Sequence, residues 1–143
     1  MIRITGMAHV GVRVTSFDRT IRFYKRLGFT VIRDDKEERV IVLKHPNGIE
    51  INLLDSVDHI NNGRNVLMDE PVHYPGYTHL AMSVTDVYRA VETVKNLGIK
   101  ITEGPVTFGD GSTSIFFRDP DLNVIELSQP RQTIGSQPSA LKG

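Results

Sequence analysis

One stretch of the chain occurs twice, as GMAHVGVRVTSFDRTIRFYKRLG in residues 6–28 and as GYTHLAMSVTDVYRAVETVKNLG in residues 76–98. The two copies align without a gap at an offset of 70 residues, and eight of the 23 positions are identical. Several of the other positions exchange one apolar residue for another. Self-similarity of this kind indicates a duplicated structural unit. We therefore expect two copies of one module in the 143-residue chain.

Each copy is expected to begin with a strand and a helix. In the first copy, valines alternate with other residues from His9 to Val14, which is the period-two pattern of a strand. Thr15 or Ser16 would cap the helix that follows, and Gly28 would end it in the left-handed conformation. The apolar stripe of this helix is expected at Ile21, Tyr24 and Leu27.

Three more strands follow the helix in each copy, so that both copies read βαβββ and the predicted fold class is α+β. Asn47-Gly48 indicates a hairpin turn between the last two strands of the first copy. The strands of the first copy are expected at residues 29–33, 39–44 and 49–54. The second copy is expected to have strands at residues 78–84, 100–103, 113–117 and 124–128, and a helix at residues 86–97.

The two modules are predicted to form one domain over residues 1–129. This domain would contain the first module in residues 5–54, a connecting segment or lid in residues 55–75, and the second module in residues 76–129. Residues 130–143 are polar and contain Gly, Pro and Ser, so we expect a flexible C-terminal tail.

Composition excludes several classes of protein. Lys plus Arg number 17 and Asp plus Glu number 17, so the net charge is zero and we expect no nucleic-acid partner. No apolar stretch is long enough for a membrane span or a secretory signal, which predicts a cytoplasmic protein without a membrane partner. The chain has no Cys, so a metal would have to be bound by His and carboxylate side chains.

Strand alternation places four polar side chains at related positions. His9 and His79 are equivalent in the repeat, and Asn52 occupies the position of Glu126. If the two sheets face each other, these four side chains converge on a central cavity. Two imidazoles and one carboxylate form a facial triad suited to one divalent metal such as Zn, Ni, Fe or Mn. Each His alone would be an ordinary polar strand residue, but the repeat favours a metal site.

Three segments resemble the vicinal oxygen chelate superfamily, which includes glyoxalase I, extradiol dioxygenases and bleomycin-binding proteins. They are Gly6 to Val14, Arg22 to Phe29, and Arg118 to Leu127 (RDPDLNVIEL). The resemblance covers residues 5–129. It implies a U-shaped mixed sheet around a metal, a small-molecule substrate and a homodimer. It also implies that His9, His79 and Glu126 are the metal ligands.

The fourth ligand position is open to more than one interpretation. In several superfamily members it is Glu or Gln, and here the resemblance places Asn52 there. Asn is a weak ligand, so water could complete the site, or Glu50 on the same face could bind the metal directly. Glu50 could instead be the general base, or a solvated strand residue. Glu126, if displaced from the metal, is the second candidate for the base.

The substrate is expected to be smaller or less anionic than a glutathione hemithioacetal. Arg13 matches an arginine that glyoxalase I uses for a glutathione carboxylate, although an ion pair on the strand face would explain it equally well. Ser56 stands where the resemblance expects an asparagine, and residues 104–111 lack the expected lysine. Asn52 and Ser83 are further candidates for substrate binding because they share the faces of the candidate ligands.

Three functions remain open from the sequence. The first is a metal-dependent lyase or isomerase of the glyoxalase type, whose substrate binds the metal through two vicinal oxygens. The second is a ring-cleaving extradiol dioxygenase with Fe(II), which a His-His-Glu triad permits. The third is a protein that binds a small molecule, such as an antibiotic, without catalysis.

Overall fold

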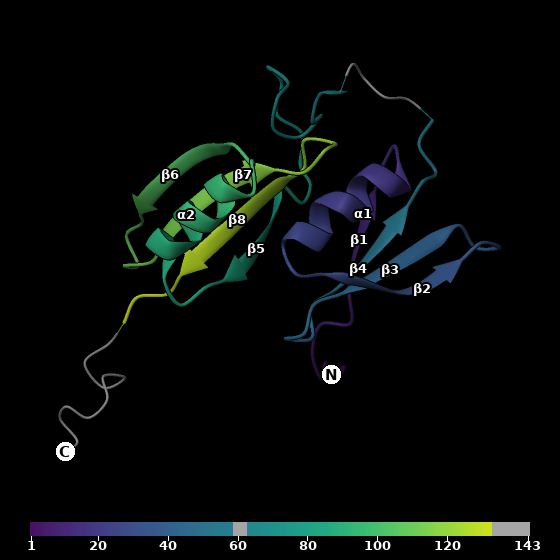
Figure 1. Cartoon of the computed structure of the whole chain (residues 1–143), viewed down its shortest axis with the longest axis horizontal. Helices are drawn as coiled ribbons and strands as arrows, with labels where there is room; N and C mark the ends of the chain where they lie inside the picture. Colours follow the sequence, from purple (N-terminus) through teal and green to yellow (C-terminus); the bar gives the residue numbers. More distant parts are fainter. Residues whose placement is uncertain (59–62, 133–143) are drawn as a thin grey trace. The chain divides into compact units, whose positions relative to one another are not determined.

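The computed structural model describes residues 1–58 and 63–132. The chain divides into two compact units, Met1–Asp69 and Glu70–Gly143. Each unit contains one copy of the βαβββ module (Figure 1). Part of the predicted lid (residues 59–62) and most of the predicted tail (residues 133–143) lie outside the described residues. In the described part of the chain, no helix combines the length and the apolar character that crossing a membrane requires.

The first unit forms a mixed four-stranded sheet with the strand order β1-β4-β3-β2. β1 is parallel to β4, and the other two neighbouring pairs are antiparallel. Its elements are β1 (Val10–Arg13), α1 (Phe17–Arg26), β2 (Thr30–Asp35), β3 (Val40–Lys44) and β4 (Glu50–Leu54).

The second unit repeats this topology with the strand order β5-β8-β7-β6. Here β5 is parallel to β8, and the remaining pairs are antiparallel. Its elements are β5 (His79–Ser83), α2 (Val87–Asn96), β6 (Ile101–Thr107), β7 (Thr113–Arg118) and β8 (Val124–Gln129). The two mixed sheets confirm the predicted α+β class and the order βαβββ in both copies.

The helix ends follow from local sequence in both units. Ser16, rather than Thr15, caps α1 by accepting a hydrogen bond from the backbone N–H of Arg19 at 3.2 Å. Asp86 caps α2 in the same way. Gly28 follows α1 with a φ of 99°, which confirms the predicted left-handed stop.

The buried face of α1 differs from the predicted stripe. Its buried residues are Thr20, Phe23 and Tyr24, whereas Ile21 and Leu27 are only half-buried. Spacings of three and four residues put the first three side chains on one face of the helix. Tyr24 was thus predicted correctly. The prediction was wrong for Ile21, where the structure buries the preceding residue, Thr20, instead.

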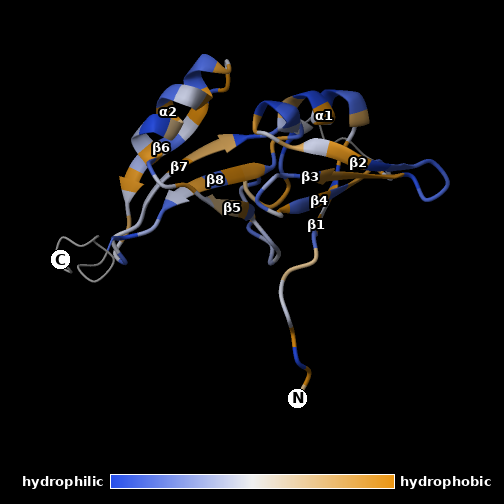
Figure 2. Ribbon diagram, turned by 60° about the horizontal axis from the view of Figure 1, so that its bottom comes forward, coloured by the Kyte–Doolittle hydropathy of each residue, from blue (hydrophilic) through white to orange (hydrophobic). Residues whose placement is uncertain are grey.

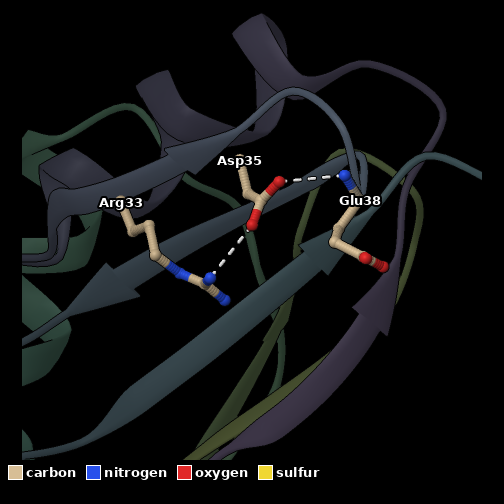
Figure 3. Close-up of polar contacts among 3 residues, drawn as sticks. All are labelled: Arg33, Asp35 and Glu38. Atoms are coloured by element: carbon tan, nitrogen blue, oxygen red, sulfur yellow. Dashed lines mark hydrogen bonds and ion pairs between the residues drawn. The ribbon is translucent and has the colours of Figure 1, made fainter.

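The hairpin of β2 and β3 is longer than predicted and ends in a polar turn. Asp35 accepts a hydrogen bond from the backbone N–H of Glu38 at 2.9 Å and pairs with Arg33 at 3.0 Å (Figure 3). Figure 2 shows this turn as hydrophilic, whereas β3 and β8 are largely hydrophobic. This contrast fits strands that carry the buried side chains of each sheet.

The strand predicted at residues 100–103 is longer in the structure, because β6 continues to Thr107. Its pairing with β7 shifts in register between Glu103 and Val106, which accommodates the intervening Gly104 and Pro105. Gly104 has a φ of 93°, and a Cβ atom there would collide with the carbonyl oxygen of Ser114 on β7. Glycine is required at this position for both reasons.

Candidate metal and substrate site

The second unit brings two of the predicted metal ligands together. The parallel pairing of β5 with β8 places Ala81 opposite Glu126, with His79 one pleat away on the same face. His79 Nε2 lies 3.1 Å from Glu126 Oε1. The imidazole is 40% exposed and the carboxylate 13% exposed, so solvent reaches the pair mainly from the side of His79.

The other oxygen of Glu126 has a partner that sequence reasoning missed. Ser114 Oγ on β7 donates a hydrogen bond of 2.6 Å to Glu126 Oε2. Ser114 is fully buried, as are Ile115 and Phe117 further along the same strand. A hydroxyl directly before the apolar run Ile115 to Phe117 is the signal that could have identified it.

A second missed residue, Thr78, lies at the far side of the imidazole. Thr78 Oγ1 lies 2.9 Å from His79 Nδ1, within hydrogen-bonding distance. The edge of the Phe116 ring contacts His79, with ring centroids 6.3 Å apart. These two contacts fix the orientation of the ring and leave Nε2 directed at Glu126, which is how ligand imidazoles are commonly held.

The first unit has the same register but different chemistry. Asn52 is opposite Gly11 in the pairing of β1 with β4, just as Glu126 is opposite Ala81. The Asn52 side-chain oxygen Oδ1 is buried and has no hydrogen-bond partner within the described part of the chain. A buried acceptor without a partner is costly, so Asn52 is suited to receive a hydrogen bond from a bound molecule.

The remaining predicted residues lie at strand ends. His9 is exposed and immediately precedes β1, and Arg13 is exposed at the other end of that strand. Glu50 begins β4, is half-buried and is opposite Lys44. Ser83 is exposed at the end of β5. Within residues 1–58 and 63–132, no three His, Asp or Glu side chains gather into a metal-binding group.

The donor set of the second unit suits a divalent metal. An imidazole nitrogen and a carboxylate oxygen that face each other are ligands used by Zn, Ni, Fe and Mn. Both side chains are already oriented by further hydrogen bonds, as expected for ligands of a metal. His79 and Glu126 therefore fit two of the ligand positions that the sequence predicts.

The turn between β6 and β7 borders the same aromatic side chains. Phe108 contacts Phe116 with ring centroids 6.4 Å apart. Asp110, two residues further on, accepts hydrogen bonds from the Ser112 side chain and backbone, and these lower the pKa of its carboxyl. The turn thus presents a carboxylate where the resemblance expects a lysine. The Arg131 side chain lies against Gly111 and supplies one cation from outside the turn.

Comparison with known proteins identifies the class to which this fold and these residues belong. Residues 6–127 match the model of the Glyoxalase/Bleomycin resistance protein/Dioxygenase superfamily. The chain belongs to this superfamily, as the repeated motifs predicted.

Individual relatives are similar over most of the chain. The lactoylglutathione lyase of Haemophilus influenzae is 33% identical over 133 residues, which cover 87% of this chain and 93% of the relative. A probable chloroplastic lactoylglutathione lyase of Arabidopsis thaliana is 36% identical over 125 residues, and the chain spans only 35% of that longer protein. The crystal structure of a bleomycin resistance determinant encoded on the transposon Tn5 matches with a TM-score of 0.66 over 90% of this chain and 100% of that one. At 21% identity, this last match supports the fold alone.

Proposed function

We propose that the chain is a metal-dependent lyase or isomerase of the glyoxalase type. Its substrate would be a small molecule with two vicinal oxygens that bind the metal. The observation that carries this proposal is the pair His79 and Glu126, whose donor atoms face each other 3.1 Å apart. The relative from Haemophilus influenzae, whose name is that of such a lyase, supports the same class of reaction.

We propose His9, His79 and Glu126 as metal ligands, with Asn52 or Glu50 at the fourth position. The ion would be Zn, Ni, Fe or Mn, one per site. When bound, it would act as a Lewis acid on the substrate oxygens.

The side chains of the chain would bind the substrate and move its proton. Glu50, half-buried at the start of β4, would take a proton from the substrate carbon and return it to the neighbouring carbon. Glu126 is the alternative base. Asn52 would accept a hydrogen bond through its buried oxygen, which otherwise has no partner in the described residues. Arg13 and Ser83 would contact polar groups of the substrate at the strand ends.

We propose a substrate with less negative charge than a glutathione hemithioacetal. The carboxylate of Asp110 in the turn between β6 and β7 would repel an anionic group, and its low pKa keeps it charged. The test compares hemithioacetals of one α-ketoaldehyde with glutathione and with 2-mercaptoethanol. We expect the higher kcat/KM with the neutral thiol, and a clear preference for glutathione would contradict this choice of substrate.

Metal content tests the proposal as a whole. Untagged wild-type protein and His79→Ala would be compared by elemental analysis after purification and after reconstitution. We expect about one divalent ion per wild-type chain and a loss of the ion in the variant. Iron together with oxygen-dependent ring cleavage would favour the dioxygenase instead. Absence of bound metal in both proteins after reconstitution would leave a small-molecule binding protein.

We also propose that the protein works as a homodimer in the cytoplasm. The resemblance to the superfamily supports the dimer, and the neutral, Cys-free composition supports the compartment. Light scattering coupled to size-exclusion chromatography tests the dimer directly, because a monomer of 16.0 kDa would contradict it.

A further inference from the structure

Glu126 has different partners at its two carboxylate oxygens. Ser114 Oγ donates to Oε2 at 2.6 Å, whereas Oε1 faces His79 Nε2 at 3.1 Å. The carboxylate is 13% exposed, so water has little access to replace either partner. The hydrogen bond from Ser114 therefore restricts the rotation of the Glu126 carboxylate and leaves its other oxygen beside the imidazole.

The buried position of Ser114 makes this bond strong. A buried hydroxyl without a hydrogen-bond partner destabilises the folded protein, and Ser114 is fully buried. A hydrogen bond to an ionised acceptor is shorter and about twice as strong as a neutral one. Ser114 and Glu126 thus hold each other in place across the β7–β8 pair.

The first unit shows what accompanies the loss of the carboxylate. Asn52 is opposite Val42, as Glu126 is opposite Phe116. Two residues earlier on these partner strands, the first unit has Val40 where the second has Ser114. The hydroxyl is therefore present beside the acid and absent beside the amide. This difference links the role of Ser114 to Glu126 rather than to the strand itself.

We propose that Ser114 is a positioning residue for the metal ligand Glu126. Its hydroxyl holds Oε2 and thereby presents Oε1, beside His79 Nε2, as the oxygen that binds the cation. Ser114 itself contacts neither the ion nor the substrate. This inference rests on the proposed metal-dependent function. Removing the hydroxyl frees the carboxylate to rotate, and losses of such outer partners typically weaken metal binding by about 10–100-fold.

The test measures the Zn²⁺ dissociation constant by competition with a chromogenic chelator. Ser114→Ala should weaken binding by about 10–100-fold. The side chains introduced by Ser114→Thr and Ser114→Val have nearly the same volume, but only the first retains the hydroxyl. The Zn²⁺ dissociation constant of Ser114→Thr should therefore lie within about threefold of the wild-type value, whereas that of Ser114→Val should rise as in Ser114→Ala. Thr107→Val is the matched control, because it removes an exposed hydroxyl on the same hairpin together with its hydrogen bond to Thr113.

The outcomes separate this inference from the proposed function. Equal Zn²⁺ affinity in wild type, Ser114→Ala and Ser114→Val would overturn the role of Ser114 and leave the metal site intact. Equal losses in Ser114→Thr and Ser114→Val would show a packing effect and would also overturn it. A wild-type protein that binds no Zn²⁺ would overturn the proposed function and the inference together. Thermal unfolding of the metal-free variants confirms that each one is folded.

Discussion

At the scale of single residues, Glu126 and Asn52 differ in how their polarity is compensated. Burying an ionised carboxylate is costly unless it is paired or hydrogen-bonded. His79 and Ser114 provide that compensation for Glu126, with distances of 3.1 and 2.6 Å. The Asn52 oxygen has no such partner in the described residues. Within the described residues, the polar atoms of Glu126 are thus compensated by protein partners, whereas the Asn52 oxygen is not.

Replacing Glu126 with Gln should abolish turnover while the fold is retained. The amide oxygen can still accept the Ser114 hydrogen bond, but the side chain loses the negative charge with which Glu126 would bind the proposed metal. We expect kcat to fall by about 100-fold or more. Steady-state kinetics with the neutral hemithioacetal and circular dichroism of the metal-free protein provide the measurements. A fully active variant would show that the site lies elsewhere.

Replacing Asn52 with Leu should increase stability and reduce substrate binding. The variant removes a buried oxygen that has no partner in the described residues, and such an oxygen costs about 1–3 kcal/mol. We therefore expect the free energy of unfolding in urea to rise by about 1 kcal/mol, and KM to rise as well. A variant less stable than the wild type by more than this amount would show that Asn52 has a protein partner in solution.

At the scale of elements, strands and helix caps could be predicted because they depend on local patterns. Alternating valines locate β1, and Ser16 and Gly28 bracket α1. β6 was predicted too short because Gly104 and Pro105 usually mark a loop. Pairing with β7 overrides that local preference, and the irregular register that permits it depends on contacts far away in the sequence.

Gly104→Ala should destabilise the β6–β7 hairpin. The positive φ disfavours a side chain, and the new Cβ would collide with the carbonyl oxygen of Ser114. We expect a loss of at least about 2 kcal/mol in the free energy of unfolding. Gly109→Ala is the control, since a Cβ there meets nothing within 4 Å. Similar stabilities of the two variants in urea would contradict the described path of β6.

At the scale of the whole molecule, the repeat explains which part of the site could be predicted. His9, His79, Asn52 and Glu126 were identified because each has an equivalent in the other copy. Ser114 was not predicted as a site residue, because its equivalent in the first copy is Val40 and a comparison of the two copies gives no matching polar residue. Hydrogen bonds between strands depend on register, which the sequence pattern alone does not provide.

The repeat also predicts how the first module could be made more like the second. Val40→Ser combined with Asn52→Glu would recreate the acid and hydroxyl of the second unit at equivalent register positions. A second carboxylate ligand should tighten Zn²⁺ binding by about tenfold or more. Asn52→Glu alone is the control and should gain less. Unchanged affinity in the double variant would argue that Asn52 does not face the metal.

The matching registers of the β3–β4 and β7–β8 pairs have a consequence for the evolution of this chain. When a strand position is duplicated, its residue can be substituted in one copy while the equivalent residue of the other copy stays the same. Positions 40 and 52 carry Val and Asn where the equivalent positions 114 and 126 carry Ser and Glu, so the two copies have diverged at this pair of positions. Selection for a new substrate would change Asn52 more readily than Glu126, because the Asn52 oxygen Oδ1 has no hydrogen-bond partner in the described residues, whereas Glu126 has partners at both oxygens.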